Sequence, residues 1–328
     1  MKVLILGGTR FLGRHLVEEG RRLGHAITLF HRGRTGLDLY PEVERILGDR
    51  DGGLRALEGR RWDAAVDTCG YVPRLVKMSA EALADAVSHY TFVSSISVYA
   101  RLERGVDERE PVATLQDPAT EAITPETYGA LKALCERAAE EAMPGRVLSV
   151  RAGLIVGPHD TTDRFTYWVR RVSMGGRVLV PGPPERPIQL IHAADLARWI
   201  YRMAEARQAG VYNATGPPEP HTMEGVVAAC REASGSRAVF VWADPGFLAE
   251  RGAAYWSELP LVADDVDGAL AADVLRAVAK GLVQRPLALT VRETLAWDAS
   301  RPAGTRLAAG LPPEKEAALL AAWEEGRP

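Results

Sequence analysis

A tyrosine and a lysine four residues apart are the side chains of this chain best suited to moving a proton. Tyr128 and Lys132 lie in a stretch rich in Ala, Leu and Glu that predicts a helix over residues 126–141. Residues four apart share one face of a helix, so the phenol and the ammonium should lie together. A free tyrosine has a pKa of about 10, and a neighbouring positive charge favours its phenolate. The pair could therefore exchange a proton with a hydroxyl or a ketone near neutral pH.

Three serines could hold the oxygen of such a group. Ser94, Ser95 and Ser97 stand at the end of an apolar run, 90–94, that predicts the fifth strand. Ligands of open α/β sheets bind at the carboxyl ends of the strands. We therefore expect one of these hydroxyls beside the phenol.

A glycine-rich turn follows the first apolar run of the chain. Residues 3–6 predict a buried strand and residues 14–23 a helix, with the turn between them. Glycines let a backbone approach a pyrophosphate, and a helix N-terminus supplies amide donors and a positive dipole end. A glycine turn that binds nothing is the alternative, and the strand–turn–helix order argues against it. The dinucleotide contacts assigned to this turn come from Gly7, Thr9, Arg10, Phe11, Leu12 and Gly13.

The end of the second strand, predicted over 26–30, bears on which nicotinamide cofactor fits. An acid about 20 residues past the glycines usually holds the ribose of NAD, and His31 occupies that place. Arg10, Arg32 and Arg34 could surround a 2′-phosphate, because guanidinium groups match phosphate oxygens. We therefore expect NAD(P)(H) and favour NADP(H); merely solvated arginines are the alternative.

Two residues on later strands complete the expected cofactor cleft. The third predicted strand covers residues 43–47 and is followed by Gly48 and Asp49. Asp49 should contact the adenine. Thr68 follows the fourth predicted strand, 64–67, and should line the cleft. A dinucleotide site next to a tyrosine–lysine pair predicts hydride transfer at a hydroxyl or ketone carbon.

Strand-like and helix-like patterns alternate through the first half of the chain. This alternation predicts an α/β fold with a Rossmann-type, doubly wound parallel sheet and a smaller α/β substrate-binding region. We assign residues 1–157 to the dinucleotide-binding domain, with 187–212 returning to it. Residues 158–186 and 213–328 form the substrate-binding region. Besides the helices 14–23 and 126–141, the sequence predicts helices over 78–87, 165–174 and 314–325, and one that begins within 191–197.

The bulk composition is that of an ordinary globular enzyme-sized chain. Its 328 residues are 47% hydrophobic and 25% charged, with a net charge of −3, which argues against a nucleic-acid partner. No apolar run reaches the roughly 20 residues that span a bilayer, and the three cysteines are widely spaced. We expect a cytoplasmic protein with a small-molecule substrate, no membrane association and no metal.

Taken together, these motifs resemble the extended short-chain dehydrogenase/reductase superfamily, in particular its NAD-dependent epimerase/dehydratase family, over about the first 215 residues. The resemblance implies that Tyr128 is the acid/base, that Lys132 binds the nicotinamide ribose and tunes Tyr128, and that Ser95 hydrogen-bonds the reacting oxygen. It also implies a homodimer. The motifs that carry it are Gly7-Gly8-Thr9-Arg10-Phe11-Leu12-Gly13, Phe92-Val93-Ser94-Ser95-Ile96-Ser97-Val98-Tyr99, Tyr128-Gly129-Ala130-Leu131-Lys132, residues 151–158 and residues 191–197.

Departures from the family pattern narrow the expected chemistry. Arg10 replaces the middle glycine, which is similar to a GGTRF subgroup that includes bacterial reductase-like proteins and chloroplast stem-loop-binding proteins. Ser95-Ile96-Ser97 replaces the Thr-Asp-Glu of 4,6-dehydratases, so dehydration is not expected. Leu154 and Ile188 replace an asparagine and an arginine that UDP-sugar epimerases use, although Arg186 is close to the second position.

We therefore expect a NAD(P)-dependent oxidoreductase or epimerase acting on a secondary alcohol or ketone of a sugar or sugar nucleotide. Epimerisation and dehydrogenation both use the same side chains, and the sequence leaves both open. The alternative is a non-catalytic dinucleotide-binding protein that acts through RNA or a protein partner. The residues expected to contact the substrate are Ser97, His159, Arg164 and Arg186.

Overall fold

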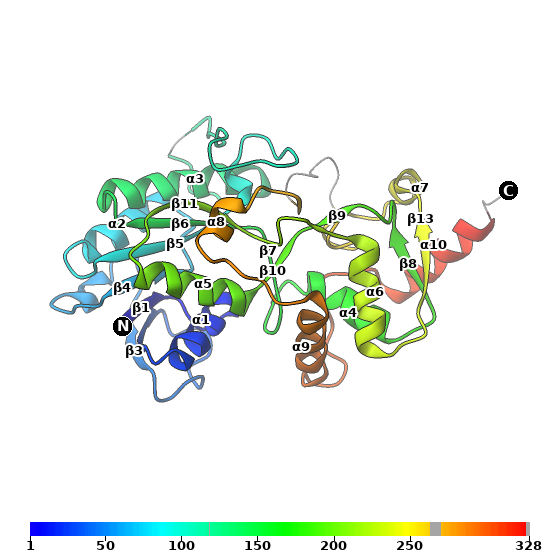
Figure 1. Ribbon diagram of the computed structural model, residues 1–328, viewed down its shortest axis with the longest axis horizontal. Helices are drawn as coiled ribbons and strands as arrows, with labels where there is room; N and C mark the ends of the chain where they lie inside the picture. Colours follow the sequence, from blue (N-terminus) through cyan, green and yellow to red (C-terminus); the bar gives the residue numbers. More distant parts are fainter. Residues whose placement is uncertain (118, 263–269, 326–328) are drawn as a thin grey trace.

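The computed structural model describes residues 1–117, 119–262 and 270–325. Seven parallel strands form the sheet of the larger lobe (Figure 1), which confirms the Rossmann-type, doubly wound arrangement. The chain order reverses direction at β1, so strands 4 to 6 and strands 2 to 3 lie on opposite sides of it. The strands run, in spatial order, β11 (Gly210–Ala214), β6 (Val147–Ala152), β5 (His89–Ser95), β4 (Ala64–Asp67), β1 (Lys2–Leu6), β2 (Ala26–His31) and β3 (Glu44–Leu47).

Helices cover both faces of this sheet. On one face lie α1 (Phe11–Arg22) and α5 (Ala193–Glu205), and on the other α2 (Pro73–Leu83) and α3 (Pro125–Ala142). Successive strand residues point to opposite faces, so Val3 and Ile5 pack in the α1/α5 core and Leu4 and Leu6 in the other. Helix α2 lies earlier than the predicted 78–87 because Pro73 starts it at its first position. Helix α1 likewise begins at Phe11, three residues before the predicted start.

The smaller lobe has a separate core of helices and short sheets. Its buried side chains include Phe165 and Trp168, and the Trp168 indole donates to the Pro260 carbonyl (2.7 Å). The predicted C-terminal helix is present, one residue longer than expected. The helices are α4 (Arg164–Ser173), α6 (Met223–Ser234), α7 (Pro245–Glu250), α9 (Leu287–Ala299) and α10 (Pro313–Glu325); the strand pairs are β8 (Arg177–Pro181) with β13 (Val239–Ala243), and β9 (Pro187–Ile188) with β12 (His221–Thr222).

The chain passes between the lobes more than once. Strands β7 (Leu154–Val156) and β10 (Leu190–His192) pair in parallel between the two lobes in Figure 1. Later, α8 (Leu275–Ala279) packs on β11, and Ala277 and Leu282 are buried in the core of the larger lobe. The division of the chain into 1–157 with 187–212 and 158–186 with 213–328 stays our prediction. It assigns the segment around α8 to the substrate-binding region, whereas α8 packs on the larger lobe.

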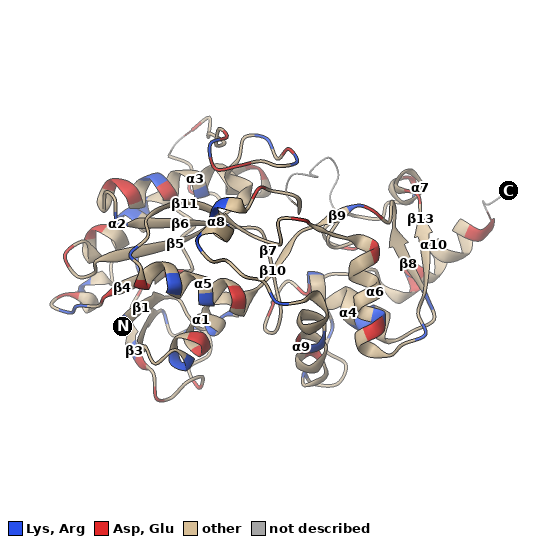
Figure 2. Cartoon of the chain, viewed as in Figure 1, with Lys and Arg blue, Asp and Glu red and all other residues tan. Residues whose placement is uncertain are grey.

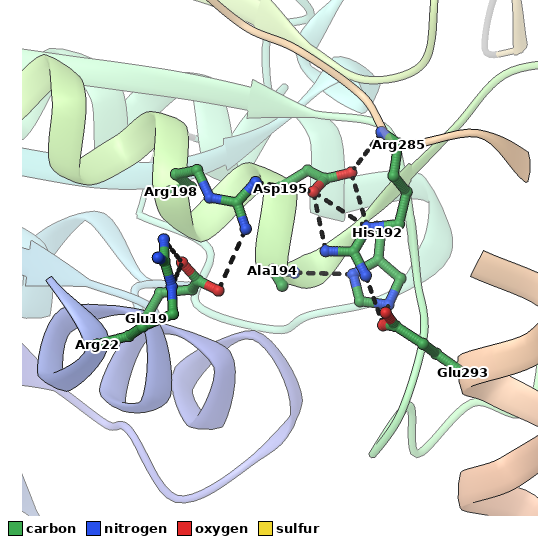
Figure 3. Close-up of polar contacts among 8 residues, drawn as sticks. All are labelled: Glu19, Arg22, His192, Ala194, Asp195, Arg198, Arg285 and Glu293. Atoms are coloured by element: carbon green, nitrogen blue, oxygen red, sulfur yellow. Dashed lines mark hydrogen bonds and ion pairs between the residues drawn. The ribbon is translucent and has the colours of Figure 1, made fainter. Parts of the chain in front are cut away.

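A buried ion pair joins the lobes where α5 begins (Figure 3). His192 caps α5 through Nδ1, which accepts from the Ala194 N–H (3.1 Å). The Asp195 carboxylate, almost fully buried, accepts from the Arg285 backbone N–H and from its guanidinium at 2.9–3.1 Å. Arg285 also contacts Glu293 of α9 (2.5 Å). This network fixes α9 of the smaller lobe against α5 of the larger one.

Charges are distributed over the whole molecule. Figure 2 shows basic and acidic residues interspersed along both lobes, in keeping with the small net charge. Within the described ranges, no helix is both long enough and apolar enough to cross a bilayer.

Candidate active site

The turn between β1 and α1 is shaped by its glycines. Gly7 and Gly8 have φ angles of +103° and +94°, which side chains disfavour. A Cβ on Gly13 would lie 2.7 Å from the Gly8 Cα, so α1 can approach the turn only with glycine there. No side chain caps the N-terminus of α1, and its first turn has no acid. The free amide donors and the glycine cradle fit a dinucleotide pyrophosphate.

The other predicted cofactor residues lie on neighbouring strand ends. The Thr68 hydroxyl donates to the Leu6 carbonyl (2.9 Å), so it ties β4 to β1 rather than standing free. Arg32 and Asp49, both half-exposed, approach one another at 4.0 Å across the ends of β2 and β3. The structure thus places Arg32 at the carboxyl ends of β2 and β3, with a carboxylate beside it.

Ser95, Tyr128 and Lys132 lie together at the carboxyl end of β5. Ser95 is the last residue of β5, and its hydroxyl is close enough to the Tyr128 phenol to lower the pKa of that phenol. The Lys132 ammonium, almost fully buried, donates to the carbonyls of Gly70 (2.8 Å) and Val93 (2.6 Å). The roles that the sequence assigns to these three residues stay a prediction.

Gly129 explains how α3 comes this close to β5. A Cβ on Gly129 would lie 1.9 Å from the Ser97 carbonyl oxygen, so any larger residue would push the helix away. On the opposing side the Ser95 Oγ accepts from the Ser97 N–H (3.1 Å) and begins the short 3-10 turn Ile96–Val98. Ser97 supports Ser95 in this way, and its own Oγ is 3.1 Å from the Ser95 Oγ.

Burial controls the proton affinities at this site. Desolvation raises the pKa of Tyr128 above 10, while the Ser95 hydrogen bond and the Arg164 charge act to lower it. Desolvation also lowers the pKa of Lys132 to about 8. The ammonium of Lys132 is therefore only partly neutralised at neutral pH, and a further positive charge beside the phenol would favour the phenolate.

Tyr71 lies in the turn between β4 and α2. Its ring lies 6.5 Å from the Tyr128 ring, and the Lys132 ammonium lies 5.3 Å from its centre. The side chain is 44% exposed, so it forms an open aromatic wall of the site. A tyrosine after a strand-ending glycine is a weak signal, and sequence alone does not show which way its ring turns.

The predicted substrate residues are not equally close to this site. Arg164, at the start of α4, acts electrostatically on Tyr128 and lies over the Trp256 ring (5.2 Å). Arg186 lies between β8 and β9, where its guanidinium contacts the Gly182 carbonyl (3.4 Å). This contact places Arg186 in the smaller lobe.

His159 packs away from the phenol, against α1 and α9. Its ring lies 6.0 Å from that of His15 and 5.6 Å from that of Trp297. Burial, followed by the charges of Arg14 and His15, lowers the pKa of His159 to about 4, so the ring is neutral. Across the residues that the structure describes, no group of three or more His, Cys, Asp or Glu side chains is placed to hold a metal ion.

Comparisons with known proteins agree on one family and one fold. Residues 59–215 match the NAD dependent epimerase/dehydratase family. The chloroplast stem-loop binding protein of 41 kDa b of Arabidopsis thaliana is 25% identical over 252 residues; the match covers 71% of this chain but only 63% of that protein's length.

Two solved structures cover most of this chain. The Thermus thermophilus UDP-glucose 4-epimerase in complex with NAD has a TM-score of 0.65 and 20% identity, over 92% of this chain and 99% of its own. The Bordetella bronchiseptica enzyme WbmH in complex with NAD+ has a TM-score of 0.66 and 15% identity, over 91% and 98%. At these identities the likeness shows a shared fold.

Proposed function

Because residues 59–215 match the NAD dependent epimerase/dehydratase family, we propose that this chain is a NAD(P)-dependent epimerase or oxidoreductase of the extended short-chain dehydrogenase/reductase type, acting on a secondary alcohol or ketone of a sugar-like substrate. The observation that supports this most is the grouping of the Ser95 hydroxyl, the Tyr128 phenol and the buried Lys132 ammonium at the carboxyl end of β5. If Ser95, Tyr128 and Lys132 only stabilised the fold, there would be no need for a buried lysine next to a phenol.

Each member of the trio has a defined task in this proposal. Tyr128 takes the proton of the substrate hydroxyl, and Ser95 donates a hydrogen bond to the same oxygen. The Lys132 ammonium stabilises the phenolate through its charge. A bound nicotinamide supplies the acceptance and return of hydride at the carbinol carbon. Epimerisation requires that the ketone turn within the site, and dehydrogenation requires that it leave; the trio serves either outcome.

The cofactor cleft supports a preference for NADP(H). His31 is buried where a ribose-binding acid would stand, and its Nδ1 accepts from the Gly33 N–H (3.0 Å). β2 therefore supplies no acid beside Arg32 and Arg34, the arginines that follow it. The related structures named above contain NAD, so the opposite preference is the direct alternative for a binding test.

Arg164 supports a substrate that carries a negative group. Among the described residues, no carboxylate lies within ion-pair distance of its half-buried guanidinium, while its charge acts on Tyr128. Trp256, beneath that guanidinium, has a φ of +63°, a strained conformation that is common at functional sites. A carboxylate or phosphate of a sugar would match Arg164 across the site from Ser95.

The direct test is to identify what the protein binds and then to remove the phenol. Native mass spectrometry of the purified protein should show a nicotinamide dinucleotide, and screened sugars or sugar nucleotides should change absorbance at the reduced-nicotinamide band. Tyr128→Phe should then lower turnover by about 10²- to 10⁴-fold with cofactor affinity unchanged. Tyr71→Phe is the matched control and should retain most activity. Full turnover by Tyr128→Phe would reject the proposal.

A second candidate function is RNA binding. The similarity to a stem-loop binding protein favours it, as does a hollow of about 840 Å³ at the amino ends of the strands, lined in part by Lys2, Arg61, Arg146 and Arg207. Arg61 and Arg146 already donate to carbonyls that end α2, which weakens this candidate. Filter binding with a stem-loop RNA at increasing salt decides it, since phosphate-driven affinity must fall steeply.

A further inference from the structure

A buried ion pair lies directly beneath the turn that follows β4. The Asp67 carboxylate has no exposed surface, and its Oδ1 lies 2.8 Å from Arg50 Nη2. The Tyr90 phenol, also fully buried, donates to Asp67 Oδ2 (2.9 Å). We refer to Arg50, Asp67 and Tyr90 as the buried triad. Taking charges out of water is costly, and the proposed chemistry above gives no role to the charges of Arg50 and Asp67.

The buried triad holds the turn to which Lys132 is bonded. Asp67 Oδ1 accepts from the Cys69 N–H (3.0 Å), and a Cβ on Gly70 would lie 3.0 Å from Asp67 Oδ2. The carboxylate therefore fits closely under residues 68–70. The Gly70 carbonyl at the end of this turn accepts from the Lys132 ammonium (2.8 Å). Moving Asp67 would move one of the two carbonyls that hold Lys132.

Asp67 also faces two cations. Arg50 Nη1 is buried, and no residue within the described ranges offers it a hydrogen-bond partner, so Asp67 matches the Arg50 charge. Burial lowers the pKa of Lys132 to about 8, and the Asp67 charge opposes that shift. The negative charge of Asp67 thus acts on both Arg50 and Lys132.

We propose that the buried triad is a positioning unit for Lys132: Asp67 supplies its counter-charge and holds its Gly70 acceptor, and Arg50 limits how much of that charge reaches it. The proposal deepens the function proposed above, since it matters only if Lys132 supports Tyr128. Arg50 and Asp67 do not contact the reacting atoms, so they act through Lys132 alone, and Tyr90 adds a hydrogen bond to Asp67 without adding a charge.

Other groups facing the ammonium do not replace Asp67. Burial raises the pKa of each thiol and phenol among them, so these groups are neutral near pH 7. The one carboxylate among them, Glu136, is paired with Arg151 (2.8 Å), which matches its charge. These groups are Tyr128, Cys135 and Glu136 from α3, and Cys69 and Tyr71 from the turn after β4.

The test reads the protonation of Lys132 directly and needs no substrate. The chain has five lysines, so protein labelled with ¹³C at lysine Cε gives few signals, and Lys132→Arg identifies the one of residue 132. In the wild type this signal should titrate near pH 8. Asp67→Asn should lower the midpoint by about one pH unit, because the counter-charge is lost. Arg50→Met should raise it by a smaller amount, because the competing cation is gone.

Tyr90→Phe is the matched control, because it removes a hydrogen bond and keeps both charges. Its midpoint should stay close to that of the wild type. If the triad were purely structural, Asp67→Asn and Arg50→Met would shift the titration midpoint of Lys132 in the same direction. Shifts of the same sign, or no shift, therefore overturn the proposal. If Asp67→Asn does not fold, the double variant Arg50→Met/Asp67→Asn removes both charges and should still titrate below the wild type. Opposite shifts without turnover on any substrate would reject the proposed function and leave the positioning role in place.

Discussion

Different kinds of interaction stabilise the cofactor turn of the larger lobe and the helices of the smaller lobe. In the larger lobe, the cofactor turn depends on local backbone geometry, with glycines at 7, 8 and 13 that leave no room for a side chain. In the smaller lobe, ion pairs join residues far apart in the chain, such as Arg170 with Asp298 and Arg171 with Glu316. The cofactor turn is determined by the close approach of backbone, whereas these helix contacts of the smaller lobe are determined by charges that meet only after folding.

This difference has a consequence for how each lobe tolerates change. A steric requirement leaves one residue type possible, and any addition displaces backbone. A buried charge instead requires its partner, and its loss leaves an unmatched ion. Substitutions in the cofactor turn should therefore damage binding, and those at the ion pairs of the smaller lobe should damage stability.

The largest effect is expected from Gly13→Ala. The added Cβ would meet the Gly8 backbone at 2.7 Å, and backbone cannot give way as a flexible side chain can. Dinucleotide affinity should fall by at least about 100-fold, or about 3 kcal/mol. Gly225→Ala in α6 is the control, since its Cβ meets only the Thr222 hydroxyl at 3.3 Å. Calorimetric titration with NADPH checks both; equal affinities would remove the steric argument.

Asp298→Ala should instead destabilise the smaller lobe. Asp298 accepts from Arg170 at 2.5 and 2.7 Å and from Arg301 at 3.2 Å, and it is nearly buried. Losing it should cost about 2–3 kcal/mol, with cofactor affinity unchanged. Glu324→Ala breaks an exposed pair with Arg177 and should cost less than about 1 kcal/mol. Thermal unfolding distinguishes the two, and a similar loss in both variants would contradict the role of burial.

At the junction of the lobes, His192→Asn should make the protein more resistant to acid. Burial, together with nearby Arg285, lowers the pKa of His192 to about 2, well below the 6.5 of an unfolded histidine. The unfolded chain therefore takes up the proton first, and wild-type stability falls as the pH drops below about 6.5. Asparagine keeps the cap on Ala194 without titrating. The variant should lose about 2 kcal/mol less between pH 7 and 4.5 in denaturant unfolding; parallel curves would mean that His192 does not titrate there.

Arg32→Ala should give the smallest change, confined to the choice of cofactor. Arg32 is half-exposed and partly matched by Asp49 at 4.0 Å, so its contribution to a 2′-phosphate is screened. NADPH affinity should fall about fivefold, near 1 kcal/mol, and NADH affinity should hold or rise as Asp49 is released. Fluorescence titration of both reduced cofactors measures this. An equal loss for both would show that Arg32 does not read the phosphate.

The sequence predicted the features that depend on neighbours in the chain. The glycine turn, the alternation of strands with helices and the Tyr128–Lys132 spacing can each be read from residues that are close together in the chain. Seen from sequence, Arg50, Asp67 and Tyr90 are three ordinary residues on separate elements, and only folding brings them together. The smaller lobe was predicted least well for the same reason, since its strands are two to five residues long and its ion pairs span more than a hundred positions.

The repeated crossing of the chain between lobes limits how this protein can be dissected. A fragment ending at Gly157 would lack β11, which pairs with β6 through residues 210–214. It would also lack Ala277 and Leu282, which fill the core beside that strand. Such a fragment would expose β6 as a bare edge, a template for intermolecular strand pairing. Neither half should survive as an independent product of proteolysis, and a single nick between them should leave both pieces associated.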